Sequence, residues 1–259
     1  MTKRLVVFLY GVVSYTAFFL VFLYALGFIG NFYVPRSLDS PARVPFTQAL
    51  LIDALLLAAF AIQHSVMARP AFKRVLTRYI PEPAERSTYV LASSLALVAL
   101  FVYWQPIGGT VWNTTDPIAR SIINGVFFLG FGLVFISTLL INHFDLFGLR
   151  QVSLYLMGKS YTQLEFRTPL FYKYVRHPLY VGWLMAFWAT PTMTGAHLLF
   201  AIMTTAYILT AIRWEERDLI AAHGEHYEDY RQNVPKLVPS FVGYRGLREP
   251  VVRSEHEAA

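Results

Sequence analysis

Residues 5–30 read LVVFLYGVVSYTAFFLVFLYALGFIG and contain no charged side chain in 26 positions. A helix of this length crosses about 30 Å of hydrocarbon with some tilt. The apolar part of a cleaved signal peptide is shorter, about 7–15 residues. We therefore interpret the stretch as a retained first transmembrane helix. Cleavage near residues 25–27 is the alternative.

The rest of the chain has the composition of a membrane protein. Of its 259 residues, 56% are apolar and 15% are charged, whereas soluble domains average about 25% charged. Further apolar stretches cover residues 47–67, 88–104 and 118–142. A region at 178–212 is interrupted by ATPTMTGAH, where Pro191 and Gly195 should end a helix. The sequence predicts an all-α integral membrane protein with five to six transmembrane segments, including a C-terminal helical hairpin. The first arm of that hairpin, 178–190, either just reaches the far side or is partly re-entrant.

Basic residues predict the orientation. Of the 22 Lys and Arg residues, 19 lie at the N-terminus, in the 68–87 and 143–177 loops, or beyond residue 212. The opposite side holds Arg36, Arg43 and Arg120. Cytoplasmic loops carry the excess of Lys and Arg, so both termini are predicted to be cytoplasmic, with the chain in the bacterial inner (plasma) membrane. The net charge of +6 lies at the ends of apolar segments and not along an exposed stripe, so no nucleic-acid partner is expected.

Several ionisable side chains should meet at the cytoplasmic boundary. They are His64, His143, Asp145, His177, Glu215 and Glu216. Such groups are costly at membrane depth and mark functional sites, so acids and imidazoles converging there predict a site. Ordinary polar residues at helix ends are the alternative.

Metal and nucleotide chemistry find little support. The chain has no cysteine, which excludes thiolate ligands and disulfides. His223 and His226 are three residues apart but have no third ligand at suitable spacing, so a solvated surface is the better interpretation. Glycine-rich phosphate loops are absent from the sequence, which supports neither a Rossmann domain nor an ATPase.

Three segments of the C-terminal half carry a specific pattern: RHPLYVG (176–182), EERDL (215–219) and HGEHYEDYRQNVPKLVP (223–239). Their order and spacing resemble the isoprenylcysteine carboxyl methyltransferase superfamily. In the N-terminal half, QHSVMAR (63–69), ERSTYVLASSLAL (85–97), WQP (104–106) and INHFDLFGLRQV (141–152) are similar to its NnrU-like branch. Within that branch they look most like bacterial methanethiol S-methyltransferases. The resemblance covers nearly the whole chain.

The resemblance implies one membrane methyltransferase domain over residues 1–259. Its N-terminal transmembrane helices would cover 1–142, its cofactor-binding loop, hairpin and cytoplasmic helix 143–240, and its tail 241–259. It also implies S-adenosylmethionine as cofactor, held under a cytoplasmic cap, and no metal. By motif position, the residues expected to hold the cofactor are Tyr174, Arg176, His177, Pro178, Tyr180, Gly182, Trp183, Glu215, Glu216, Tyr227 and Tyr230. Gly182 is expected to permit close backbone approach.

The implied reaction is S_N2 methyl transfer to a small thiol, with methanethiol as the expected acceptor and dimethyl sulfide as the product. The nucleophile must be a thiolate, and a thiol such as cysteine has a pKa of about 8.5, so a base or a nearby cation is needed. His143 is the first candidate base, with Asp145 orienting it or acting instead. His64 is the second, and Arg213 is a candidate to stabilise the thiolate or to pin a carboxylate. A helix-capping or packing role is the alternative for His143.

Two other functions fit the same motifs. One is a membrane methyltransferase for a lipid-like acceptor, such as a prenylcysteine carboxylate or a phospholipid amine. The other is an NnrU-like membrane protein that is not an enzyme.

Overall fold

The computed structural model describes residues 1–246, and this part of the chain is mostly helical. The part of the predicted tail beyond residue 246 therefore lies outside the described residues. Five helices are long and apolar enough to cross a membrane. They are α1 (Thr2–Gly30), α2 (Phe46–Ala68), α4 (Glu85–Tyr103) with the 3₁₀ turn η1 (Glu82–Ala84) before it, α5 (Pro117–Leu140) and α9 (Gly195–His223). The apolar stretches predicted the first four of these helices to within a few residues, whereas α9 continues past the predicted apolar end at residue 212, to His223.

Shorter elements connect the long helices. They are α3 (Pro70–Leu76), α6 (His143–Leu146), α7 (Leu149–Leu156), the 3₁₀ turn η2 (Leu170–Lys173), α8 (Pro178–Trp188), α10 (Glu225–Asn233) and the strands β1 (Thr110–Asn113) and β2 (Thr192–Thr194). Local chemistry explains several boundaries. Asp116 accepts a hydrogen bond from the Ala119 N–H at 2.8 Å to cap α5. The Thr194 hydroxyl caps α9 in the same way, and Gly224, with φ of +55°, separates α9 from α10.

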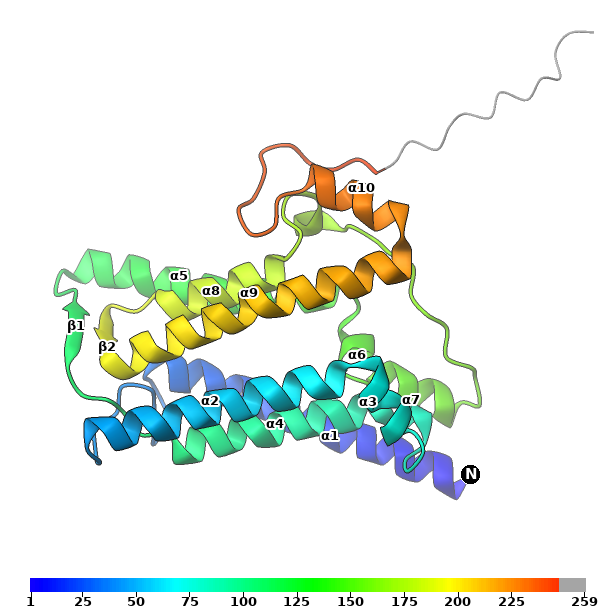
Figure 1. Ribbon diagram of the computed structural model, residues 1–259, viewed down its shortest axis with the longest axis horizontal. Coiled ribbons are helices and arrows are strands. Elements are labelled where there is room, and N and C mark those ends of the chain that lie inside the picture. The colour runs from blue at the N-terminus through cyan, green and yellow to red at the C-terminus, as the bar shows by residue number, and fades with distance from the viewer. Residues whose placement is uncertain (247–259) are drawn as a thin grey trace, which may run out of the picture.

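The long helices form two layers (Figure 1). α1, α2 and α4 pack in one layer, while α5, α8 and α9 form the other. α10 lies against the C-terminal part of α9, and α7 packs on α1. α2 of the first layer packs on α9 of the second. The Ser65 and Tyr207 hydroxyls, 3.1 Å apart, and the exposed pair of Arg69 and Asp218, at 3.2 Å, also join these two helices.

A short two-stranded sheet joins the layers at one end of the helices. β1, in the loop after α4, pairs antiparallel with β2, in the turn between α8 and α9, so that Thr110 faces Thr194 and Asn113 faces Thr192. The carboxylate of Asp39, in the loop after α1, accepts from the Thr194 hydroxyl and lies 3.0 Å from His197 Nδ1. Pro191 and Gly195 separate α8 from α9 as predicted. Because β2 pairs with β1, the short α8 ends at the same side of the molecule as α4.

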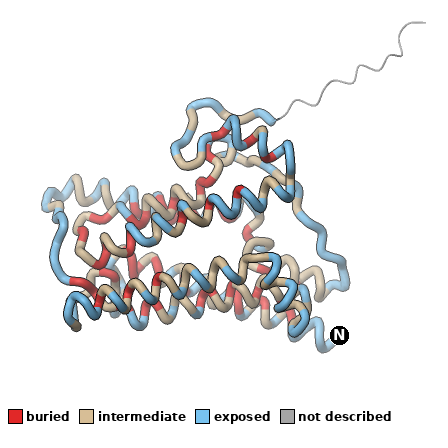
Figure 2. Tube along the Cα trace, in the orientation of Figure 1, coloured by how far each residue is buried: buried red, intermediate tan, exposed pale blue. Residues whose placement is uncertain are grey.

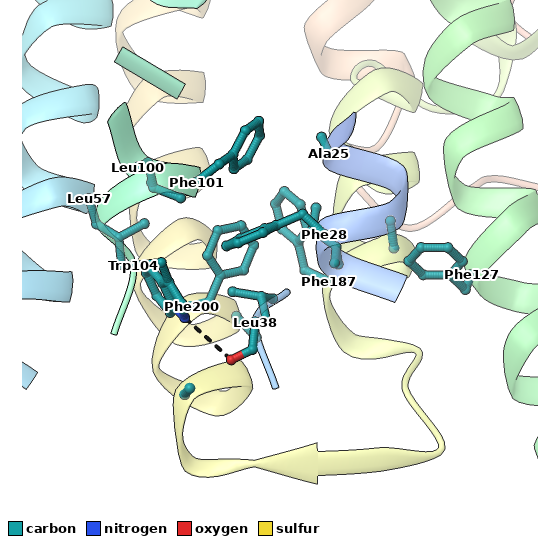
Figure 3. Close-up of a cluster of buried hydrophobic side chains, with 14 of the residues drawn as sticks. Ala25, Phe28, Leu38, Leu57, Leu100, Phe101, Trp104, Phe127, Phe187 and Phe200 are labelled. Carbon is teal, nitrogen blue, oxygen red and sulfur yellow. Dashed lines mark hydrogen bonds between the residues drawn. The ribbon is translucent and has the colours of Figure 1, made fainter. Parts of the chain in front are cut away.

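The main apolar core lies near the end of the helices at which β1 pairs with β2 (Figure 3). Phe28, Leu100, Phe187 and Phe200 bring together α1, α4, α8 and α9. The indole of Trp104 donates a hydrogen bond of 3.3 Å to the Leu38 carbonyl. Buried positions also follow the facing sides of α5 and α8, while the outer faces of the helices are exposed (Figure 2). Apolar side chains on the outer faces of the helices are what a bundle needs in order to lie in the hydrocarbon of a membrane.

Candidate functional site

The RHP motif forms the N-terminal end of α8. Pro178 occupies the first helical position, where its missing N–H costs nothing, and His177 is the N-cap residue. His177 and Pro178 are buried. The Arg176 N–H donates to the Pro235 carbonyl at 2.9 Å, and the His177 N–H donates to the Lys236 carbonyl at 3.3 Å. These bonds hold the C-terminal VPK segment against the motif.

An acidic pair on α9 faces this motif. Glu216 is buried, and its Oε1 lies 3.1 Å from His177 Nε2 and 3.2 Å from Arg176 Nη1. Glu215 is half exposed and accepts a hydrogen bond of 2.8 Å from the Tyr180 hydroxyl. Three residues of the RHP motif segment, Arg176, His177 and Tyr180, therefore contact the acidic pair from another helix.

Lys236 completes the charge set. Its Nζ lies 3.9 Å from Glu216 Oε2, which places a third basic group near this acid. Sequence reasoning did not select Lys236, although it stands inside the VPKLVP segment that carried the resemblance. The two prolines that flank Lys236 could have indicated its role, because they favour an extended backbone, which can form hydrogen bonds with a neighbouring extended segment.

α10 and the segment after it cover the motif. Tyr227 and Tyr230 are buried with Val234 and pack on Phe166. The Tyr230 hydroxyl donates to the Tyr172 carbonyl at 2.6 Å. Tyr230 therefore fastens the covering helix.

Two buried polar groups at this site have no partner among the described residues. They are Nε of Arg176 and the hydroxyl of Tyr227, whereas Nη1 of Arg176 forms an ion pair with Glu216. Burial, with a further contribution from Glu216, raises the pKa of Tyr227, so this phenol stays protonated and can donate. Buried polar groups are nearly always paired, and an unpaired guanidinium N–H suits a carboxylate. The site has the donor set for a ligand that carries an acid group.

Other residues predicted to contact the cofactor have different surroundings. A Cβ atom on Gly182 would lie 2.6 Å from the Gly130 carbonyl oxygen of α5, so the close approach that this glycine permits is helix packing. The Trp183 ring packs on Phe131 at 5.4 Å between centroids, in the aromatic core. The side chain of Tyr174 is exposed and lies beside Gly243.

His143 is buried and both of its ring nitrogens are engaged. Nε2 lies 2.8 Å from the Tyr15 hydroxyl, and Nδ1 lies 2.8 Å from Thr138 Oγ1. Thr138 donates its own proton to the Phe135 carbonyl at 2.6 Å, so Nδ1 carries a proton and Nε2 accepts from Tyr15. Burial lowers the pKa of His143 and keeps it neutral.

The arrangement gives His143 no free lone pair for a substrate proton. A general base needs one within hydrogen-bond reach of its substrate, so the geometry does not favour His143 in that role. Asp145 does not orient it either, because Asp145 pairs with Arg150 at 2.8 Å. Both residues instead tie α6 to its surroundings.

His64 lies on α2, between α4 and α9. Its Nδ1 is 3.1 Å from Ser93 Oγ, and the Tyr89 hydroxyl lies 2.7 Å from its Nε2 and 3.1 Å from its Nδ1. The Tyr207 ring is 6.4 Å away between centroids. Arg213, on α9, is exposed. Tyr89 and Ser93 were not predicted as site residues, although Tyr89 stands in a segment that carried the resemblance.

Two cavities lie at the other end of the helices. One of about 380 Å³ is lined by Asn31, Asp39, Arg120 and Thr192 among others, and one of about 100 Å³ by Arg36 and Trp104 among others. Neither touches the RHP motif. Within residues 1–246, no three His, Asp or Glu side chains are placed to hold a metal ion.

Comparisons with known proteins agree with the motifs. The chain is 59% identical to a methanethiol S-methyltransferase of Crocosphaera subtropica over 93% of this chain and 94% of that protein. It is 54% identical to methanethiol S-methyltransferase 2 of Bradyrhizobium diazoefficiens over 95% of this chain and 94% of that protein. It is 49% identical to the methanethiol S-methyltransferase of Mycobacterium tuberculosis over 92% of this chain and 97% of that protein.

No solved structure matches the chain. The model of the NnrU protein family matches residues 51–224, which is more than half of the chain and includes the RHP motif and the acidic pair. The chain therefore belongs to the NnrU family.

Proposed function

We propose that this protein transfers the methyl group of S-adenosylmethionine to methanethiol and releases dimethyl sulfide. The observation that carries the proposal is the relationship to methanethiol S-methyltransferases at 49–59% identity over more than 90% of both chains. The site around Arg176, His177, Glu215 and Glu216 supports it independently, because its unpaired donors fit the acid group of the cofactor.

The cofactor would be held by complementary charges. The Arg176 Nε–H and the Tyr227 hydroxyl suit its carboxylate, and the half-exposed Glu215 suits its ammonium group or ribose hydroxyls. Glu216 holds His177 and Arg176 in place. Tyr180, fixed by Glu215, presents an aromatic ring that would attract a sulfonium by about 0.5–2 kcal/mol. When bound, S-adenosylmethionine supplies an electrophilic methyl group that a thiolate can attack in line.

Catalysis would rest on positioning and electrostatics. The protein must hold the thiolate sulfur about 3–3.5 Å from the methyl carbon and exclude water. A weakly acidic thiol must also lose its proton, and stabilisation of the thiolate in the site favours that loss. His64, the second candidate base, has both ring nitrogens within hydrogen-bond distance of Ser93 or Tyr89, so it offers no freer nitrogen for this task than His143 does.

The membrane arrangement proposed for this function places both termini in the cytoplasm of a bacterial cell. Of the 22 basic residues, the 19 on one side support it. α8 and α9 would form the predicted transmembrane hairpin. The segment around α10 would be the cytoplasmic cap over the cofactor, within one domain divided at about residues 142 and 240.

A direct test uses the purified protein in detergent with S-adenosylmethionine labelled in its methyl group. Methanethiol, a phospholipid amine and a prenylcysteine are offered in parallel. Label should pass to methanethiol and not to the lipid-like acceptors. Transfer to a lipid-like acceptor alone, or calorimetry that detects no binding of S-adenosylmethionine, would contradict the proposal.

A further inference from the structure

The segment that follows α10 runs back along the RHP motif, and residues 235–246 of it are called the strap. Figure 1 shows the strap turning back from α10 over the N-terminal end of α8. Four backbone hydrogen bonds of 2.8–3.3 Å join the strap to residues 173–177. With the N–H donor named first, they run from Arg176 to Pro235, His177 to Lys236, Ser240 to Tyr174 and Tyr244 to Lys173.

The tip of the strap, residues 238–242, exposes apolar side chains. The exposed fraction is 103% for Phe241, 77% for Val242 and 75% for Val238. None of the three belongs to a buried apolar cluster of the described residues. A single exposed apolar side chain is ordinary, but three within five residues form a patch of the kind that marks a binding surface.

The packing of α8 on α5 places the tip at the level of the membrane. The two helices run antiparallel, because a Cβ atom on Gly182 would lie 2.8 Å from the Val134 nitrogen, while one on Gly130 would lie 2.8 Å from the Ala186 nitrogen. The N-terminal end of α8 therefore lies beside the last turns of α5. There Ile136 and Leu139 are apolar and exposed, as lipid-facing residues are. Lipid that covers this end of α5 also reaches the level of the strap.

The charges around the tip suit a membrane surface. Residues 237–246 contain no acidic side chain, and Lys173 and Arg245 are exposed beside them. Anionic lipid headgroups attract such basic residues. The ring of Tyr174, exposed and adjacent to Gly243, is of the type enriched at the headgroup level. An apolar tip flanked by basic residues and a tyrosine is the pattern of an interfacial membrane contact.

We propose that Val238, Phe241 and Val242 insert into the membrane leaflet that borders the N-terminal end of α8. In the proposed orientation this is the cytoplasmic leaflet. Lipid is the occupant because the apolar surface of α5 continues to this level and because the flanking charges match anionic headgroups. The membrane contact goes beyond the proposed reaction and does not depend on it.

Insertion would also restrain the part of the strap that lies on the site. The Pro235 and Lys236 carbonyls accept the backbone N–H groups of the RHP motif, and Lys236 Nζ lies 3.9 Å from Glu216 Oε2. A tip held in lipid keeps these groups beside the motif. This consequence for cofactor binding rests on the proposed function.

The test measures the depth of a spin label at the tip. The chain has no cysteine, so Phe241→Cys provides a single site for a nitroxide label. The labelled protein is reconstituted in vesicles of phosphatidylethanolamine and phosphatidylglycerol. Oxygen concentrates in hydrocarbon, whereas a polar nickel chelate stays in water, so paramagnetic resonance with each reagent reports the depth. We expect the label at residue 241 to collide more with oxygen than with the chelate.

The matched control is Glu225→Cys with the same label. Glu225 is an exposed residue at the junction of α9 and α10, on the same cytoplasmic segment but outside the strap. Its label should collide more with the nickel chelate than with oxygen. If Phe241→Cys does not fold, Val242→Cys is measured in its place and decides by the same readings.

Two outcomes would overturn the membrane contact. One is a tip label that is as accessible to the nickel chelate as the label at residue 225. The other is a tip label shielded from both reagents, which would mean that protein covers the tip, either residues 247–259 or a second copy of the chain. Both readings are independent of activity, so a protein that methylates no thiol would contradict the proposed function alone.

A second measurement tests the link to the cofactor site. Phe241→Ser combined with Val242→Ser removes the apolar tip without touching the strap backbone bonds. In the same vesicles this variant should bind S-adenosylmethionine severalfold more weakly than the wild type. Equal affinity would overturn the link between the tip and the site, while the spin-label readings decide the membrane contact.

Discussion

Two histidines that the sequence offers as candidate bases, His143 and His64, both have their ring nitrogens engaged within the protein. His143 has both nitrogens satisfied by Tyr15 and Thr138, whose protons and lone pairs are used up within the protein. His64 Nδ1 lies 3.1 Å from Ser93 Oγ, and the Tyr89 hydroxyl lies within 3.1 Å of both ring nitrogens of His64. Residue type predicts that a histidine can act as a base, whereas its bonded partners decide whether a nitrogen is free to do so.

Glu216 is the residue with the largest expected effect on cofactor binding. Replacing it with Gln removes the charge that Arg176 and His177 face in a buried setting, and breaking such a pair costs about 3–5 kcal/mol. We expect at least a tenfold weaker binding of S-adenosylmethionine in calorimetry. Glu225→Gln, an exposed acid on α10, should bind as the wild type does. If both variants bind S-adenosylmethionine with equal affinity, Glu216 is not part of the cofactor site.

His143 predicts a pH dependence of stability. Its pKa is lowered in the folded protein from 6.5, so the unfolded chain binds the proton more readily. The stabilising contribution is complete above pH 6.5 and is lost as the pH falls below it, by at most about 1.4 kcal/mol per pH unit. Melting in detergent between pH 7.5 and 5 should show this loss, and His143→Asn should flatten it. If the melting temperature of the variant falls with pH as steeply as that of the wild type, a group other than His143 causes the acid sensitivity.

At the scale of elements, α5 and α8 touch backbone to backbone. Gly130 and Gly182 face each other, and a Cβ atom on Gly130 would lie 2.7 Å from the Gly182 carbonyl oxygen. Small residues allow such close approach between membrane helices. The contact fixes the N-terminal end of α8, and with it His177, relative to the rest of the bundle.

Two alanine substitutions in α5 test this packing. Gly130→Ala should destabilise the protein by about 1–3 kcal/mol because neither backbone can move away without loss of contacts. Gly125→Ala meets no atom within 4 Å and should be neutral or stabilise by about 0.5–1 kcal/mol. Thermal unfolding in one detergent compares them. A Gly130→Ala protein as stable as Gly125→Ala would contradict the close contact.

At the scale of the molecule, the local parts of the fold were readable from sequence and the contacts between distant segments were not. Apolar runs predicted the five long helices, and Pro191 with Gly195 predicted the break before α9. The pairing of β1 with β2, and the bond between Tyr15 and His143, join residues far apart in the chain. No local pattern specifies such contacts. Likewise, the motif predicted that Arg176, His177 and Glu216 lie close together, and they do. Gly182 and Trp183, in contrast, pack between helices.

The proposed orientation can be tested because the chain has no cysteine. A single cysteine at exposed Val111, in β1, should react with an impermeant maleimide added to intact cells. A cysteine at exposed Tyr79, in the loop between α3 and η1, should react after the membrane is opened. The reverse pattern would place both termini outside.

The most direct measurement is the mass of the volatile product formed by the purified protein from methanethiol and S-adenosylmethionine with a trideuterated methyl group. We expect dimethyl sulfide carrying three deuterium atoms in the headspace, made by the wild type and reduced at least tenfold by Glu216→Gln at limiting cofactor. Unlabelled dimethyl sulfide, or none from a wild-type protein that binds the cofactor, would contradict direct methyl transfer to methanethiol at this site.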